Sequence, residues 1–155
     1  RVPLVIDADA LKLLPADLPA ETLLTPHAGE LARLLGVERG EIEADPVAAA
    51  VLAAGRFGAT VLLKGAIQPV ASPDGSVRLA LPGPAWTAQA GSGDVLAGAC
   101  GTLLAAGLSA GRAGLMAASL QALPRAVPAR CAGVAFPRGA LWALGPRSAM
   151  TVDTG

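Results

Sequence analysis

The segment at residues 90–98, A-G-S-G-D-V-L-A-G, has the spacing most suggestive of chemistry. Glycines flank Ser92, Asp94 follows, and small and apolar residues come next. The pattern predicts a tight turn leading into a helix, whose unpaired N–H groups and positive dipole end favour an anion such as phosphate. We interpret Asp94 as the group that orients a substrate hydroxyl beside that phosphate. The alternative is that Asp94 only complements the charge of the helix start.

A second candidate is the run at residues 25–30, T-P-H-A-G-E. It predicts a helix with the threonine as N-cap and the proline as first helical residue. His27, the only histidine of the chain, then lies in the first turn, which favours a neutral ring, and Glu30 shares its face. Glu30 can hold hydrated magnesium through water. Alternatively, it favours the helix dipole and pairs with Arg33 on the surface.

Lys64 ends an apolar run and is followed by Gly65, Ala66, Ile67 and Gln68. A lysine at the carboxyl end of a strand can reach phosphate oxygens, or it can simply mark the exit to solvent. Asp7 and Asp9 follow another apolar run. They are either turn formers or polar groups that line the same cleft.

These residues need a scaffold that brings strand ends together, and strands alternating with helices predict an α/β fold with a mainly parallel sheet. In such sheets ligands bind beyond the carboxyl ends of the strands, so we expect Asp9, His27, Lys64 and Asp94 to share one cleft. We expect the helix that opens at Pro46 to bury Val47, Val51, Leu52 and Ala54. The other expected elements are strands at 2–6, 21–24 and 60–64, a hairpin of 69–71 and 77–81, a helical turn at 10–14, and helices at about 25–36, 46–55, 92–106 and 110–123.

Composition excludes several classes of protein. Twelve basic and twelve acidic residues among 155 give no net charge, which argues against a nucleic-acid partner. The longest apolar stretch is too short to cross a bilayer, so we expect no membrane segment. Cys100 and Cys131 lack a metal-binding spacing and are expected to be reduced thiols in the cytoplasm. The mean hydropathy of +0.54 favours a homo-oligomer.

The chain opens directly on an apolar strand, and a buried parallel strand needs neighbours on both edges. We therefore expect this sequence to be part of a longer protein. Residues 1–155 are expected to form a single, partial domain, with 124–155 as an irregular C-terminal segment rich in proline and arginine.

Four motifs in one order point to a family: V-I-D-A-D-A-L at 5–11, L-T-P-H-A-G-E-L-A-R-L-L-G at 24–36, V-L-L-K-G at 61–65, and A-G-S-G-D-V-L-A-G at 90–98. Over about residues 2–123, the chain resembles the ADP-dependent NAD(P)H-hydrate dehydratases, a branch of the ribokinase-like superfamily. The resemblance implies a three-layer ribokinase-like fold that lacks its N-terminal portion here.

The resemblance also implies an activity. ADP, or ATP in some members, phosphorylates the hydroxyl of hydrated NADH or NADPH, and loss of phosphate restores the ring. Asp94 would be catalytic, His27 and Asp94 would bind the substrate, and magnesium would bridge phosphates with Glu30 contacting it through water. An NAD(P)H-hydrate epimerase would be a fused or separate partner. Nucleotide contacts would come from Lys64, Gly65, Ala66, Ile67, Gln68, Gly91, Ser92 and Gly93.

The chain departs from the family pattern at two positions and in its extent. Gln68 and Gln89 stand where threonine is common, and the N-terminal half of the fold is missing. We therefore expect the 155 residues alone to be inactive. Two other functions stay open: a ribokinase-like kinase acting on a vitamin-type alcohol, and a non-catalytic nucleotide-binding remnant.

Overall fold

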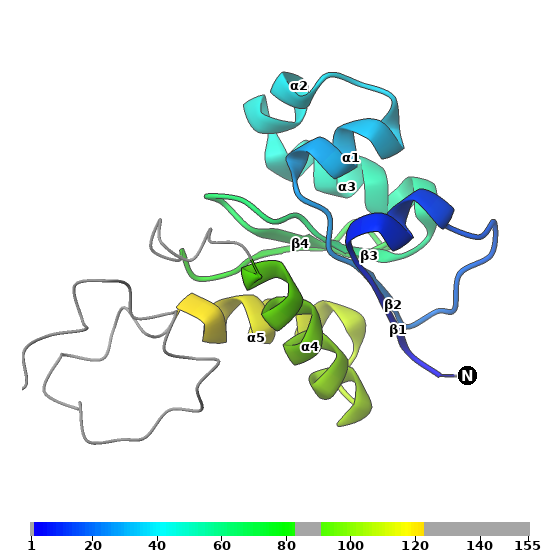
Figure 1. The fold of residues 1–155 in the computed structure, drawn as a ribbon, viewed down its shortest axis with the longest axis vertical. Coiled ribbons are helices and arrows are strands. Elements are labelled where there is room, and N and C mark those ends of the chain that lie inside the picture. The colour runs from blue at the N-terminus through cyan, green and yellow to red at the C-terminus, as the bar shows by residue number, and fades with distance from the viewer. Residues whose placement is uncertain (1, 83–90, 123–155) are drawn as a thin grey trace, which may run out of the picture.

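The computed structural model describes residues 2–82 and 91–122. A five-stranded sheet forms its centre, with the strands in sequence order across the sheet. Helices cover both faces (Figure 1). The strands are β1 (Leu4–Ile6), β2 (Thr22–Leu24), β3 (Thr60–Leu62), β4 (Pro69–Ala71) and β5 (Val77–Leu79).

Strands β1, β2 and β3 pair in parallel, whereas β4 pairs antiparallel with both β3 and β5. Four of the five strands therefore run in the same direction, which confirms the predicted mainly parallel sheet. The predicted hairpin is also confirmed, and its turn contains Gly75 at φ 83°. The strands themselves are shorter than expected at β1 and β3.

Alternate side chains of the strands enter two separate cores. Leu23 and Leu62 belong to the core beneath α4 (Ser92–Ala105) and α5 (Ala110–Ala122). Their neighbours Leu24 and Val61 belong to the core beneath α1 (Ala28–Leu35) and α3 (Pro46–Phe57). This period of two is that of a sheet buried on both faces. The result is the expected three-layer arrangement of helices, sheet and helices (Figure 1).

The predicted start of α1 is wrong by two residues. The N-cap is His27 rather than Thr25, and the helix begins at Ala28. Thr25 instead continues the strand ladder, since its backbone N–H donates to the Ile6 carbonyl at 3.1 Å and its hydroxyl approaches the same oxygen at 3.4 Å. The predicted end is confirmed, with Gly36 in the left-handed region at φ 75°.

The buried face of α3 matches the expected one in part. Ala54 is fully buried and Val51 packs partly buried against the core, as predicted, but Leu52 is 60% exposed. The other fully covered positions are alanines, including Ala50 and Ala53, whose small side chains let this helix lie close to the sheet. The helix runs to Phe57 and ends at Gly58 rather than near Gly55. A six-residue helix, α2 (Arg39–Ala44), was not predicted.

A short 3₁₀ helix, η1 (Ala8–Leu13), replaces the helical turn expected at 10–14. On the other face, α4 and α5 match the predicted helices within a residue or so and are separated by Gly107 at φ 89°. Gln89, Cys131 and the segment 124–155 lie outside the described residues, so those expectations stay untested. No helix in 2–82 or 91–122 is long and apolar enough to cross a membrane.

Candidate functional site

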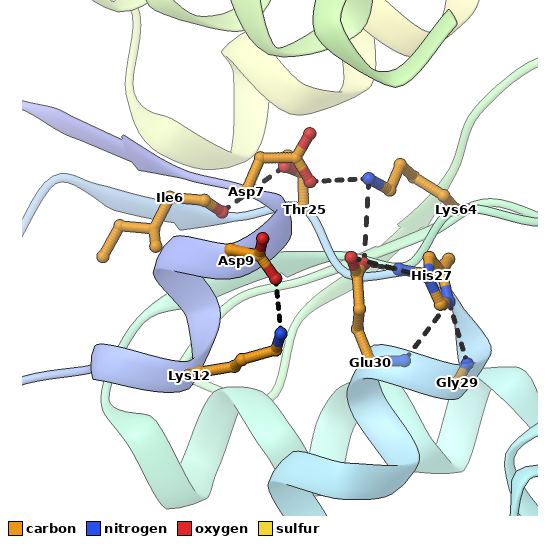
Figure 2. Close-up of polar contacts among 9 residues, drawn as sticks. All are labelled: Ile6, Asp7, Asp9, Lys12, Thr25, His27, Gly29, Glu30 and Lys64. Atoms are coloured by element: carbon orange, nitrogen blue, oxygen red, sulfur yellow. Dashed lines mark hydrogen bonds and ion pairs between the residues drawn. The ribbon is translucent and has the colours of Figure 1, made fainter. Parts of the chain in front are cut away.

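Lys64 stands at the centre of a charged cluster formed where three strands end (Figure 2). Its Nζ lies 2.5 Å from Asp7 Oδ1 and 3.9 Å from Glu30 Oε2. The side chains of Lys64, Asp7 and Glu30 are 19%, 13% and 15% exposed. These charges are thus largely withdrawn from solvent, where they interact more strongly than on an open surface.

The backbone fixes the positions of these residues. Asp7 follows β1 directly, and Lys64 lies just beyond β3. Lys64 donates its N–H to the Pro26 carbonyl at 2.8 Å, and an isolated parallel bridge pairs it with His27. The ladder therefore extends past the named strands, and the carboxyl ends of β1, β2 and β3 meet at one edge of the sheet.

His27 and Glu30 cap α1 reciprocally. His27 Nδ1 accepts hydrogen bonds from the N–H groups of Gly29 and Glu30 at 3.0 and 3.2 Å, while Glu30 Oε2 accepts from the His27 N–H at 2.8 Å. An Nδ1 that accepts cannot carry a proton, so the ring proton is on Nε2. Nε2 lies 3.5 Å from Glu30 Oε1, and the side chain is 51% exposed. His27 therefore presents a hydrogen-bond donor outward.

We predict that the neutral ring of His27 is the Nε2–H tautomer. Because His27 is the only histidine, ¹⁵N NMR of labelled imidazole reads this one site directly. Asparagine is a good N-cap, so His27→Asn should keep the stability of α1, whereas His27→Ala should lose about 1 kcal/mol of unfolding free energy. A predominant Nδ1–H tautomer, or equal stability of the two variants, would contradict this assignment.

The glycine turn approaches the same cluster from the other face of the sheet. Gly91 is the N-cap of α4 and adopts φ 84°, a left-handed backbone conformation that favours glycine. A Cβ on Gly93 would lie 3.4 Å from Lys64 Nζ and 3.7 Å from Asp7 Oδ2. The first turn of α4 thus packs against the Lys64–Asp7 ion pair.

The donors of this turn are not consumed by the described part of the chain. Within 2–82 and 91–122, no acceptor binds the backbone N–H groups of Ser92, Gly93 or Asp94. Asp94 is exposed and forms no ion pair with a described residue. Gln121 donates to the Ser92 carbonyl at 2.9 Å, which ties α5 to the start of α4. The arrangement can therefore receive an anion.

A cleft of about 600 Å³ opens on the other side of Lys64. It includes His27 and most of the predicted nucleotide loop, but neither Gln68 nor the Gly91–Asp94 turn. The Oε1 atom of Gln68 is instead buried without a partner among the described residues. Helix α2 supplies one wall of the cleft. The sequence analysis did not predict this wall, because it did not predict a helix at Arg39–Ala44. The lining residues are His27, Ala28, Arg39, Ile42, Glu43, Pro46, Leu63, Lys64, Gly65, Ala66 and Ile67.

The structure separates the two aspartates that the sequence left equivalent. Asp7 is buried in the cluster, whereas the Asp9 side chain is 91% exposed and pairs with Lys12 on η1. That lysine holds the pKa of Asp9 below its ordinary value. The expectation that Asp9 shares the cleft is therefore wrong. The alternative surface pair of Glu30 with Arg33 is not formed either, since Glu30 faces His27 and Lys64.

Cys100 lies on α4 below the cluster and is fully buried. Burial, with a smaller contribution from the Asp7 carboxylate, raises the pKa of its thiol to about 12. The structure thus agrees with the expected buried, unpaired thiol at this position.

We predict that Cys100 resists alkylation in the folded protein. The test uses the Cys131→Ser variant, in which Cys100 is the single cysteine. A thiol of pKa about 12 is thiolate in only about one molecule in ten thousand at about pH 8, and the thiolate is the form that reacts. Mass spectrometry after iodoacetamide treatment should show label only when denaturant is added. Rapid labelling without denaturant would contradict the burial of Cys100.

The cluster can hold a magnesium ion through water and phosphate oxygens, but not through a full set of protein ligands from the described residues. No group of three or more His, Cys, Asp or Glu side chains within the described ranges is arranged to bind a metal. Carboxylate oxygens are ligands that Mg²⁺ accepts, and this ion commonly keeps several waters and takes further ligands from phosphates. Since Oε2 of Glu30 is used in the capping box, Oε1 is the atom suited to a contact through water.

Comparison with known proteins agrees with these motifs. A family model described as NAD(P)H-hydrate dehydratase matches residues 1–135. The chain is 50% identical over 119 residues to a bifunctional NAD(P)H-hydrate repair enzyme of Mycobacterium tuberculosis, covering 72% of this chain and 24% of that one. It is 43% identical over 141 residues to an ADP-dependent (S)-NAD(P)H-hydrate dehydratase of Neisseria meningitidis, covering 86% and 48%.

Solved structures give the same result for the fold. An ADP/ATP-dependent NAD(P)H-hydrate dehydratase of Bacillus subtilis, co-crystallised with ATP and Mg²⁺, superposes with a TM-score of 0.75 at 28% identity, covering 94% of this chain and 53% of that one. A ribokinase-like superfamily protein of Enterococcus faecalis superposes with a TM-score of 0.69 at 25% identity, covering 95% and 52%. The predicted ribokinase-like fold is thereby confirmed.

The chain spans about a quarter of the mycobacterial relative and about half of the neisserial one. The matched range of the family model, residues 1–135, includes the segments that form the site: the strand ends with Asp7 and Lys64, the capping box of His27 and Glu30, and the glycine turn before α4. The family model covers more than half of the sequence. The chain therefore belongs to the NAD(P)H-hydrate dehydratase family.

Proposed function

We propose that this chain carries the nucleotide-binding and catalytic part of an ADP-dependent NAD(P)H-hydrate dehydratase. The observation that carries the proposal is the meeting of two positive groups. The ammonium of Lys64 lies 3.4 Å from the place of a Cβ on Gly93, at the N-terminus of α4. Both groups favour an anion with several oxygens, and a transferring phosphoryl group is such an anion.

The nucleotide would lie along the loop that follows β3. Lys64, Gly65, Ala66 and Ile67 line the cleft, and the exposed glycine and alanine leave room for a planar base. The phosphates would point toward the glycine turn, where the N–H groups of Ser92 and Gly93 are available. Gln68 does not line the cleft, and its carbonyl accepts from the N–H of Ala80 at 3.1 Å, so in this proposal it supports the end of the loop.

Asp94 would orient the ring hydroxyl of the hydrated nicotinamide and accept its proton as the phosphoryl group is transferred. Its exposed carboxylate in the first turn of α4 leaves it accessible to a substrate. Phosphoryl transfer depends mainly on positioning and charge stabilisation, which the helix start supplies. His27, as an Nε2–H donor, would bind an acceptor oxygen of the substrate. ADP, having given up its terminal phosphoryl group, would leave as AMP. Loss of phosphate together with a proton from the adjacent ring carbon would then restore the double bond of the ring.

In the proposed reaction magnesium is the cofactor and the nucleotide is the co-substrate. When bound, the ion neutralises phosphate charge, and Glu30 Oε1 would contact it through water. The Bacillus subtilis relative was co-crystallised with ATP and Mg²⁺, and the neisserial relative is named as ADP-dependent. These names support the proposal for this chain.

We also propose three features of its setting. The mycobacterial relative is bifunctional, which supports an association with an NAD(P)H-hydrate epimerase, fused or separate. Exposed apolar side chains such as Val2, Leu13 and Leu52, at 83%, 82% and 60%, support burial against a further copy or part of the protein. The substrate is a product of NADH or NADPH, which supports a cytoplasmic location.

The test is the recovery of reduced-nicotinamide absorbance from hydrated NADH in the presence of ADP and Mg²⁺. Phosphate should be released in step with the recovered NADH. Accumulation of a phosphorylated alcohol without phosphate release would favour the vitamin-type kinase, and ADP binding without turnover in the complete protein would favour the non-catalytic remnant.

A further inference from the structure

Asp7 occupies a position that the proposed function does not use. It is the first residue after β1, and its carboxylate forms the shortest contact that Lys64 makes in the cluster, at 2.5 Å between Oδ1 and Nζ. Its other oxygen, Oδ2, lies 3.7 Å from the place of a Cβ on Gly93. Asp7 thus lies between the lysine and the glycine turn. Figure 2 shows its contact with Lys64.

The backbone next to Asp7 is strained. Ala8 adopts φ 52°, the left-handed region, and is the only residue other than glycine with positive φ in the described part of the chain. Such a conformation is unfavourable for an L-residue with a side chain, because its Cβ comes too close to the following carbonyl oxygen. Backbone strain of this kind persists where the surrounding structure holds it and is found preferentially at functional sites. Here it lies where the chain leaves β1 and turns into η1, directly beside the buried carboxylate.

Lys64 needs such a partner because its stem is flexible. An unrestrained lysine loses the rotamer freedom of its long side chain when it is fixed in one position. The N-terminus of α4 would repel the ammonium if no anion lay between them. The Asp7 carboxylate compensates both effects, and Glu30, at 3.9 Å, adds a weaker contact.

We propose that Asp7 is a positioning residue that holds the ammonium of Lys64 against Gly93 before the phosphates arrive. The proposal rests on the proposed function, since it assigns Lys64 to the phosphate site. Asp7 itself does not bind the nucleotide, because its negative charge repels phosphate. Its contribution is the placement of Lys64 where charge develops during phosphoryl transfer.

This role predicts a separation of kcat from KM. In Asp7→Asn, Lys64 can still reach the phosphates, so KM for ADP should stay equal or fall. Lys64 is then no longer held in place, so kcat should fall about tenfold, the change that a loss of about 1.4 kcal/mol produces. A merely structural role for Asp7 would instead lower the melting temperature and raise KM.

Asp9→Asn is the matched control. It lies two residues along the same D-A-D run, makes the same chemical change, and sits on the exposed surface with Lys12. We expect it to leave both kcat and KM unchanged. Asp7→Glu keeps the charge and should restore part of the activity lost in Asp7→Asn.

A double-mutant cycle completes the test in the complete, active protein. If Asp7 acts through Lys64, then Lys64→Met and Lys64→Met/Asp7→Asn should have the same kcat within about twofold. Additive effects of the two changes, or an unchanged kcat in Asp7→Asn, would overturn the proposal. If Asp7→Asn does not fold, Asp7→Ser, which also removes the charge, takes its place, and a wild-type kcat there overturns the proposal as well. An unchanged KM for ADP in Lys64→Met would instead refute the nucleotide site itself.

Discussion

Replacement of Asp94 by asparagine in the complete protein is expected to lower kcat for the proposed NAD(P)H-hydrate dehydration by about a hundredfold or more. General acid–base groups typically contribute factors of this size. The amide keeps the shape of the carboxylate but cannot accept a proton from the substrate hydroxyl. Because Asp94 is exposed and makes no ion pair with a described residue, the fold should be unaffected.

The measurement is steady-state turnover of hydrated NADH with ADP, together with thermal unfolding of each variant. Asp17→Asn is the control, since Asp17 is also exposed and lies in the connection before β2, away from the site. We expect wild-type turnover from Asp17→Asn. Equal turnover in Asp94→Asn and the wild-type protein would mean that Asp94 only complements the helix dipole.

Replacement of Lys64 by methionine is expected to weaken ADP binding by about tenfold to a hundredfold. A hydrogen bond to a charged group contributes about 1.5–3 kcal/mol, which corresponds to that range. Methionine keeps the length and apolar volume of the lysine stem, so the packing beside Gly93 is largely preserved. Isothermal titration with ADP measures the loss.

The change also leaves the mostly buried carboxylate of Asp7 without its partner, which destabilises a protein. The double variant Lys64→Met/Asp7→Asn removes both charges and should recover unfolding free energy while ADP binding stays weak. Arg56→Met is a suitable control for the loss of a basic residue, because Arg56 lies on α3 and donates to the Leu35 carbonyl at 3.1 Å. Wild-type ADP affinity in Lys64→Met would refute the assignment of this lysine to the phosphates.

These variants separate binding, positioning and chemistry within one small cluster. Lys64→Met tests the affinity for the nucleotide, Asp7→Asn tests the placement of the lysine, and Asp94→Asn tests the proton transfer. Lys64→Met is measured by ADP affinity, whereas Asp7→Asn and Asp94→Asn are both measured by kcat, and the double-mutant cycle with Lys64→Met tells whether the loss at Asp7 acts through the lysine.

The sequence by itself determined the layered α/β fold and the motifs of the site. Periods of two and of about 3.6, together with glycine and proline at the element boundaries, are local signals, and they predicted the hairpin, the end of α1 at Gly36 and the α4–α5 pair. The order of the four motifs indicated the family, which the comparisons confirmed.

Only the tertiary structure decided which of these polar residues meet. Asp7 and Asp9 look equivalent in the sequence, yet the turn at Ala8 sends one carboxylate to Lys64 and leaves the other on the surface. Thr25 looked like an N-cap, but its hydroxyl faces Ile6 across the ladder. Such choices depend on contacts between residues far apart in the chain, 57 positions for Asp7 and Lys64. Local propensity carries no information about a partner at that separation, so the positioning role of Asp7 emerged only from the folded chain.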